Sequence, residues 1–237
     1  MTVQSTGNRS FFHYRGANQY LNVEHFDFDK IDSRILHMGY ALLLDALDGK
    51  DYEYGTVMAR VLSMAQSHGI KTSLDVVSEN SDRFSKVIPP SLKYCNYFIV
   101  NEFEASLTTG IPDRDKSGKL IIENMEIICK KLLYMGVRDL VVIHAPEGGF
   151  AMEANGNYYI QPSLKLPEGY IKGTVGAGDA FCAGMLYSIY KGWSTQKALE
   201  IAVSSAACCL SHVNATDGMK DISVIEELYN KMDKVEL

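Results

Sequence analysis

Short apolar segments alternate with longer segments of helical spacing along most of this chain, and that alternation limits the folds it can adopt. Strands are predicted over residues 35–39, 70–77, 97–100 and 140–143, with helical segments between them. Parallel strands joined by connections of about ten or more residues need right-handed crossovers, which place helices on both faces of the sheet. The sequence therefore predicts an α/β fold of three layers, α/β/α, around a mainly parallel central sheet.

Turn signals complete the expected order of elements. Asn155-Gly156 lies between two short apolar segments and predicts a β-hairpin of residues 150–152 and 158–161. Pro89 and Pro90 predict a short turn. Helices are expected over residues 55–68, 102–108, 118–135, 179–190, 195–210 and 223–232, and an aromatic strand over residues 10–15.

Length and charge narrow the class of protein further. The chain has 237 residues, with 23 Lys and Arg against 29 Asp and Glu and a formal net charge of -6. This is the wrong sign for a protein that binds phosphate backbones, so nucleic acid is not an expected partner. No apolar stretch approaches the roughly 20 residues needed to span a bilayer, so no membrane association is expected. The five cysteines lack Cys-x-x-Cys spacing and are expected to be reduced thiols of a cytoplasmic protein.

Residues 173–181 carry the clearest chemical signal. Two glycines flank an alanine at Gly176-Ala177-Gly178, directly before a segment of helical spacing. Backbone N–H groups can converge at such a turn, and the helix that follows adds its positive end, so the segment predicts an anion site. Asp179 at this helix start is also a residue type that commonly caps helices, and a plain capping role stays open on this pattern alone.

Other phosphate-binding loops fit this sequence less well. The Gly-Lys pairs, Gly49-Lys50 and Gly118-Lys119, lack the upstream glycine and the following Ser or Thr of a Walker loop. A dinucleotide-binding fingerprint would need a third glycine at Phe181. Both types of loop are therefore excluded.

The segment from Thr174 to Phe181 resembles the C-terminal signature of the ribokinase-like PfkB carbohydrate kinase family, Asp-Thr-x-Gly-Ala-Gly-Asp-Ala-Phe, with Gly173 in place of the first Asp. The resemblance implies an anion hole for the transferred phosphoryl group and a base that takes the proton of the acceptor hydroxyl. The implied catalytic residues are Gly176, Ala177, Gly178 and Asp179, and Thr174 is an implied nucleotide contact. Phosphoryl transfer needs such groups because it depends on positioning and on stabilising charge.

Two further segments resemble motifs of the same family. Asn101 and Glu104 match the motif Asn-x-x-Glu, which implies that they organise Mg²⁺ and phosphates, with Glu104 acting on the ion through water. Without the resemblance, the pair would be only a helix start with an acidic first turn. Residues 143–148 stand where the family has Thr-x-Gly-x-x-Gly against the nucleotide, with Ala145 at the first glycine and Gly148 retained. Val203 and Asn214 replace the usual Asn and Gly of segments that are linked to a monovalent cation in the family. Whether this chain binds such a cation is therefore left open.

Three residues match the substrate side of the family. Tyr14 and Arg15 resemble a Tyr-Arg pair that fructokinase-like and keto-deoxygluconate kinase-like members direct toward the sugar, although Arg15 could equally form a salt bridge of the lid. Gly39 lies in an apolar strand and allows either close approach of the sugar or tight packing. Residues 1–17 are expected to be a remnant of a lid strand, and residues 18–237 a ribokinase-like nucleotide-binding domain.

Family members normally begin with a substrate-binding strand and further lid strands, so the resemblance implies an N-terminally truncated member that lacks this strand and most of the lid. Strand edges are then expected to be open near residues 35–39 and 70–77, which favours self-association, most simply as a homodimer. The implied function is an ATP-dependent sugar kinase that uses ATP and Mg²⁺ to phosphorylate a primary hydroxyl of a monosaccharide of fructose, ribose or keto-deoxygluconate type. A nucleoside kinase of the same family and an inactive nucleotide-binding remnant are the alternatives.

Overall fold

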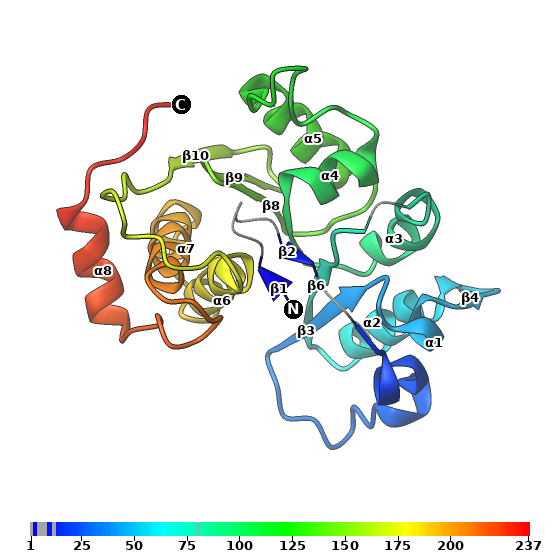
Figure 1. The fold of residues 1–237 in the computed structure, drawn as a ribbon. Helices are drawn as coiled ribbons and strands as arrows, with labels where there is room; N and C mark the ends of the chain where they lie inside the picture. Colours follow the sequence, from blue (N-terminus) through cyan, green and yellow to red (C-terminus); the bar gives the residue numbers. More distant parts are fainter. Residues whose placement is uncertain (1, 4–8, 11–12, 80) are drawn as a thin grey trace.

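The structure is a computed structural model that describes residues 2–3, 9–10, 13–79 and 81–237 (Figure 1). Its central sheet has six strands in the order β10-β9-β8-β7-β6-β3. Strands β3 (Ile35–Ala41), β6 (Lys71–Val76), β7 (Tyr97–Asn101) and β8 (Leu140–Ala145) are parallel, and β9 (Gly148–Glu153) and β10 (Tyr158–Pro162) continue the sheet as an antiparallel hairpin. The predicted α/β class, the mainly parallel sheet and the hairpin are confirmed.

Helices cover both faces of this sheet and make three layers (Figure 1). The long helices are α2 (Val57–Ser67), α3 (Phe84–Leu92), α4 (Glu102–Thr109), α5 (Ile122–Tyr134), α6 (Ala177–Tyr190), α7 (Thr195–Leu210) and α8 (Ile222–Lys231). The shorter elements are β1 (Thr2–Val3), β2 (Arg9–Ser10), α1 (Asp45–Asp48), β4 (Lys50–Asp51), β5 (Gly55–Thr56) and two 3₁₀ helices, Gly16–Tyr20 and Val23–His25.

Alternating residues of the strands pack against different helices, which is why the layers hold together. Phe98 and Val100 of β7 belong to the core shared with α2, α3, α4 and α5, whereas Ile99 between them packs with α6 and α7. Helix α8 lies outside α7, where Ile225 packs against Ile201 and Cys208. Strands apolar on both sides are the pattern expected for a sheet covered on both faces.

The edges of the described sheet agree only in part with the expectation from the sequence. Strand β3 pairs with β6 alone and ends the sheet on its side. Strand β6 lies between β3 and β7 and is paired on both sides, so the open edge expected at residues 70–77 is wrong.

The turn predicted at Pro89 and Pro90 is also wrong, because both residues lie inside α3. This helix buries Phe84, Ile88 and Leu92, which recur every four residues on one face. The two missing N–H groups leave carbonyls of the preceding turn without helical partners, but that turn is exposed to water. Burial of the apolar face therefore outweighs the local preference of proline.

Two other predicted boundaries differ from the structure. Helix α5 begins at Ile122 rather than at residue 118, because the chain before it forms a turn in which Asp115 N–H donates to the Lys119 carbonyl over 2.9 Å. Of the strand predicted over residues 10–15, residues 11–12 lie outside the described part of the chain and residues 13–15 form no strand; a 3₁₀ helix follows at Gly16–Tyr20.

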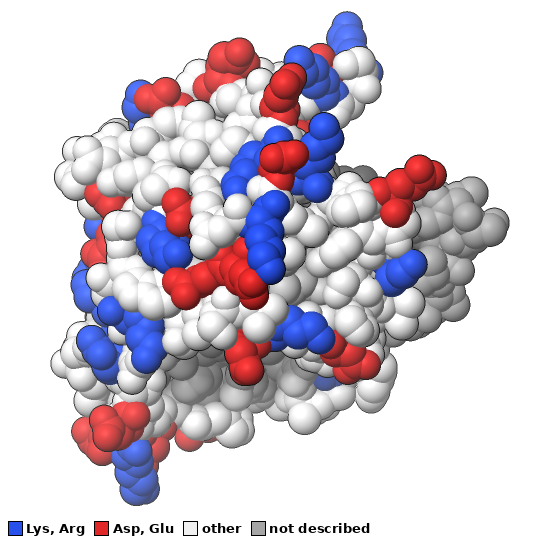
Figure 2. All heavy atoms as spheres, turned by 90° about the vertical axis from the view of Figure 1, so that its left-hand side faces the viewer, with Lys and Arg blue, Asp and Glu red and all other residues white. Residues whose placement is uncertain are grey.

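The surface charges and the cysteines of the described residues have no specialised arrangement. Acidic and basic side chains are interspersed on the face shown in Figure 2 and are separated by wide uncharged areas. The cysteines Cys95, Cys129, Cys182, Cys208 and Cys209 are buried and free. Among the described residues, no helix combines the length and the apolar character that a membrane crossing requires.

Candidate active site

Two cavities meet at the first turn of α6. One has a volume of about 590 Å³, and Ala177 and Gly178 are part of its wall. The other has a volume of about 410 Å³, and its wall includes Asp179, the next residue of the same turn. Consecutive residues of one helix start therefore face two adjacent spaces, at the edge where the parallel strands end.

The larger cavity combines a polar end with an apolar wall. Asn101 and Ala145, at the ends of β7 and β8, line it together with Thr174. The opposite wall is apolar and is contributed mainly by α7 and by the segment before α6: Val203, Ala206, Ala207, Leu210, Leu164, Leu166 and Ile171. Such a space suits a ligand with a flat apolar part and an anionic tail, because the tail can reach the N–H groups at the helix start.

The smaller cavity contains the acid expected to be the base. Asp179 shares it with Gly39 and Tyr40 of β3, and the Tyr40 hydroxyl donates a hydrogen bond to Asp179 Oδ1. The pKa of Tyr40 is raised, first by burial and then by this hydrogen bond, so its phenol stays protonated and acts as a donor. The side chain of Asp179 is thereby oriented by a residue of β3 that lines the same cavity.

Gly176 has a backbone conformation that suits glycine. It precedes α6 with φ 81°, in the left-handed region, and a Cβ atom there would lie 2.5 Å from the Cβ of Ala215. Both the dihedral angle and the close approach of the 215 backbone therefore require a residue without a side chain. The turn that presents the N–H groups of α6 depends on this glycine.

We expect Gly176→Ala to lower the free energy of unfolding by roughly 2 to 5 kcal/mol, because the left-handed conformation and the clash both add cost. Gly192→Ala is the matched control, since Gly192 has φ 72° but a Cβ atom there would meet no other atom within 4 Å. That control should lose only about 1 to 2 kcal/mol. Denaturant titration of both variants measures the difference, and equal losses would contradict the close packing against Ala215.

Asn101 and Glu104 form a reciprocal cap at the start of α4. Asn101 Oδ1 accepts from the Glu104 N–H over 2.8 Å, and Glu104 Oε2 accepts from the Asn101 N–H over 3.0 Å. Ser78 Oγ donates to the other oxygen of Glu104 over 2.7 Å. Asn101 lines the larger cavity, whereas Glu104 is buried behind it, and burial raises its pKa to about 7. The pair is thus a helix cap, and Asn101 also faces the cavity.

Asp75 is an acidic residue of the site that the sequence did not single out. It lies near the end of β6 and is only 8% exposed, in the wall of the smaller cavity. Burial raises its pKa to about 8, and the nearby charges of Glu104 and Asp179 add to the effect. The available signal was an aspartate between two apolar residues, Leu74 and Val76, just before the carboxyl end of the strand.

The buried acid makes stability depend on pH. The folded protein keeps the Asp75 proton up to about pH 8, whereas the unfolded chain releases it near the ordinary value of 3.8. The Asp75 contribution to the free energy of unfolding therefore falls as pH rises between these values, by up to roughly 1.4 kcal/mol per pH unit. Asp75→Asn should flatten this dependence by roughly 1 to 3 kcal/mol between about pH 5.5 and about pH 7.5.

Unfolding by guanidinium chloride, followed at both pH values, measures the free energy of unfolding of each variant. Asp115→Asn is a suitable control, because hydrogen bonds from Ser117 and neighbouring N–H groups lower the Asp115 pKa and move its titration below this window. An Asp75→Asn variant whose stability changes across the window as much as that of the wild type would contradict the raised Asp75 pKa.

His144 and Gly148, from the third motif, occupy different environments. His144 lines the larger cavity beside Phe181, with ring centroids 5.0 Å apart, and burial lowers its pKa to about 4, so the ring is neutral at pH 7. A Cβ on Gly178 would lie 3.1 Å from this ring. Gly148 is outside the cavity wall: it begins β9, where a Cβ would lie 2.6 Å from the Gln161 carbonyl oxygen. Its lack of a side chain serves strand pairing.

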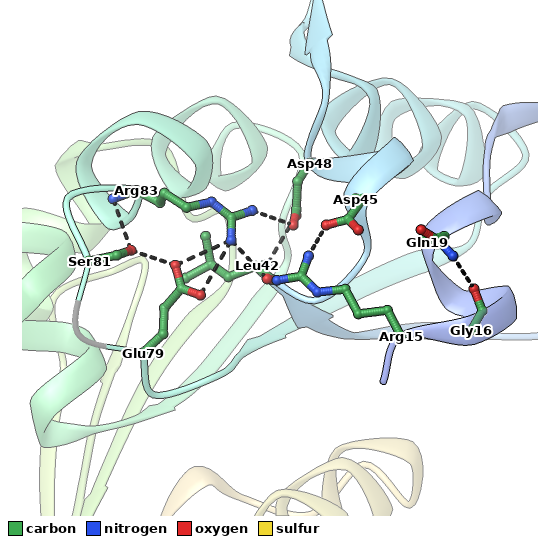
Figure 3. A network of polar contacts seen from close by, with 9 residues as sticks. All are labelled: Arg15, Gly16, Gln19, Leu42, Asp45, Asp48, Glu79, Ser81 and Arg83. Carbon is green, nitrogen blue, oxygen red and sulfur yellow. Dashed lines mark hydrogen bonds and ion pairs between the residues drawn. The ribbon is translucent and has the colours of Figure 1, made fainter. Parts of the chain in front are cut away.

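Tyr14 and Arg15 do not line either cavity. Tyr14 is 88% exposed, and Arg15 forms an ion pair with Asp45 of α1, as the salt-bridge alternative anticipated (Figure 3). Beside this pair, Arg83 binds Asp48 over 2.9 Å and donates to the Leu42 carbonyl over 3.0 Å. The network fixes the loop after β3.

Asn214 has a local role as well, since its side chain accepts from the Asp217 N–H over 2.9 Å.

The fold and these cavities define an α/β protein of the ribokinase-like type. Residues 1–222 match the model of the pfkB family carbohydrate kinases, and the chain belongs to this family. It is 25% identical over 173 residues to a ribokinase from Schizosaccharomyces pombe, an alignment that covers 71% of this chain and 50% of that protein. The chain thus spans about half the length of this relative.

Solved structures show the same fold. A ribokinase from Thermotoga maritima superposes with a TM-score of 0.71 at 19% identity, over 97% of this chain and 68% of the other. A ribokinase from Arabidopsis thaliana complexed with ribose and ATP has a TM-score of 0.59 at 22% identity, over 72% of this chain and 51% of the other. The predicted ribokinase-like class is therefore confirmed.

Proposed function

We propose that this chain is an ATP-dependent kinase that transfers the γ-phosphoryl group to a primary hydroxyl of a monosaccharide. One observation carries the proposal: Gly178 faces the larger cavity and Asp179 the smaller one, so a donor and an acceptor can approach the same helix start from two sides. Membership of the carbohydrate kinase family supports the reaction type, and the ribokinase names of its relatives support a sugar acceptor.

In this mechanism the nucleotide occupies the larger cavity, with its phosphates directed at the N–H groups of residues 176–178. The sugar lies in the smaller cavity with its primary hydroxyl beside Asp179. The hydroxyl oxygen forms a bond to the γ-phosphorus, the bond from that phosphorus to the bridging oxygen of ADP breaks, and the hydroxyl proton passes to the Asp179 carboxylate. The backbone amides stabilise the charge on the transferred group, and Tyr40 keeps the carboxylate oriented.

The residues around Asn101 fit a magnesium ion that accompanies the nucleotide. Mg²⁺ prefers oxygen ligands and usually keeps several waters; here Asn101 lies at the polar end of the larger cavity, and the buried carboxylate of Glu104 is hydrogen-bonded to its N–H group. One Glu104 oxygen accepts a hydrogen bond in the cap and the other accepts from Ser78 Oγ, which favours contact with the ion through water. When bound, the ion would neutralise phosphate charge.

The test combines binding with turnover on the full chain. Calorimetry with Mg·ATP measures nucleotide binding, and a coupled assay measures ADP formed in the presence of ribose, fructose, keto-deoxygluconate or a nucleoside. ADP formation that depends on one of the sugars would support the proposal. Dependence on the nucleoside instead would assign a nucleoside kinase, and ATP binding without turnover on any acceptor would assign a nucleotide-binding protein. A folded sample that binds no Mg·ATP at millimolar concentration would overturn the placement of the nucleotide.

A further inference from the structure

Three potential metal ligands converge in the smaller cavity, each from a different element. They are His37 of β3, Asp75 of β6 and Cys182 of α6, and their donor atoms all lie within 4.8 Å of one another. Asp75 and Cys182 are buried, and His37 is the exposed member. None of the three has a part in the phosphoryl transfer proposed above.

A neighbouring contact orients the histidine toward the other two ligands. His37 Nδ1 pairs with Ser73 Oγ over 3.1 Å, on the strand beside it, which leaves Nε2 as the free ring nitrogen. Gly39 separates this nitrogen from Asp75. A Cβ atom added at Gly39 would lie 3.6 Å from His37 Nε2 and 3.4 Å from the Asp75 Cβ, so Nε2 and Asp75 border the same space. Ring nitrogens of metal-binding histidines are commonly fixed by such a hydrogen bond on the opposite nitrogen.

The combination of ligands selects the class of ion. Thiolate, imidazole and carboxylate together suit Zn²⁺ and similar transition metals, whereas Mg²⁺ prefers oxygen ligands in octahedral geometry. Donor atoms around one tetrahedral zinc ion are roughly 3 to 4 Å apart, given zinc–ligand distances of about 2.0 to 2.3 Å. The present spacing of at most 4.8 Å needs only small side-chain rotations to reach that geometry.

We propose that His37, Asp75 and Cys182 bind one divalent transition-metal ion of the zinc type, with its fourth position open to the cavity. On binding, the Cys182 thiol forms a sulfur–metal bond and the Asp75 carboxyl group an oxygen–metal bond, and each releases its proton to solvent. The bound ion would lie beside Asp179, in the space proposed for the acceptor hydroxyl, and would therefore inhibit phosphoryl transfer. Metal binding itself requires neither nucleotide nor sugar, so it can be tested whether or not the kinase proposal holds.

Cobalt is the probe of choice, because a Co²⁺–thiolate bond gives a charge-transfer absorption that carboxylate and imidazole alone do not give. Titration of the chain with Co²⁺ should produce this band with a stoichiometry of one ion per chain, and Zn²⁺ should remove it by displacement. A large excess of Mg²⁺ should leave the band unchanged, because magnesium does not compete for a thiolate.

Two variants assign the band to these residues. Cys182→Ser should abolish it, whereas Cys208→Ser, a change at a cysteine of the same 4% exposure in α7, should leave it intact. Ser73→Ala keeps all three ligands but frees the His37 ring, and should weaken Co²⁺ binding roughly 10- to 100-fold. Circular dichroism verifies that each variant is folded.

The proposal is overturned if the wild-type chain shows no thiolate band, if the band survives in Cys182→Ser, or if Cys208→Ser removes it. Unchanged Co²⁺ affinity in Ser73→Ala would overturn the orientation of His37. A folded His37→Gln variant provides a second check, since loss of a direct ligand should weaken binding at least as much as the loss of Ser73.

Discussion

Asp179→Asn is expected to lower sugar-dependent ADP formation by about 10² to 10⁴, the usual scale of general base catalysis, and to leave Mg·ATP affinity nearly unchanged. The amide retains the shape of the side chain but cannot take the proton of the acceptor hydroxyl. Its position supports a selective effect, because Asp179 faces the smaller cavity while the nucleotide is proposed to fill the larger one. Steady-state kinetics and calorimetry on the same preparation separate the two quantities.

Asp221→Asn is the matched control for this change. Asp221 precedes α8 as an acid at a helix start, and it makes no side-chain cap hydrogen bond, so its replacement should leave turnover unaffected. Wild-type turnover in Asp179→Asn would mean that Asp179 is only a helix-start acid, and the proton transfer proposed here would be wrong.

Local sequence patterns predicted the architecture well where the apolar periodicity was clear. Helix α7 coincides with the prediction for residues 195–210, and Ser194 caps its start by accepting a hydrogen bond from the Lys197 N–H. The prediction at Pro89 and Pro90 failed because it weighed a local preference and could not include the apolar face that α3 buries against the rest of the core. Such tertiary packing becomes visible only when distant segments are assembled.

The candidate site shows the same division between local and distant information. Gly176, Ala177, Gly178 and Asp179 are contiguous, so the signature identified them directly. Tyr40 and Asp75 come from two different strands and meet Asp179 only because β3, β6 and α6 converge on one cavity. Nothing in the sequence around Tyr40 indicates a partner 139 residues away. Conversely, Glu104 was predicted by its motif, but in the structure one of its oxygens accepts in the cap at the start of α4 and the other accepts from Ser78.

Ala206→Trp should abolish measurable nucleotide binding, which corresponds to a loss of at least about 100-fold, or about 2.7 kcal/mol. Ala206 lies on α7 in the apolar wall of the larger cavity, and an indole at this position would extend into the space proposed for the nucleotide base. The residue is only partly buried at the edge of the core, so the larger side chain has the cavity to extend into. Calorimetry with Mg·ATP measures the loss.

Val213→Trp introduces the same side chain nearby and is the control. Val213 is 71% exposed and lies outside the wall of the larger cavity, so this variant should bind Mg·ATP like the unaltered chain. Thermal unfolding of both variants separates a filled cavity from a damaged fold, since Ala206→Trp is expected to keep a melting temperature close to that of Val213→Trp. A folded Ala206→Trp that still binds Mg·ATP normally would place the nucleotide base elsewhere, because the cavity cannot hold both the indole and the base.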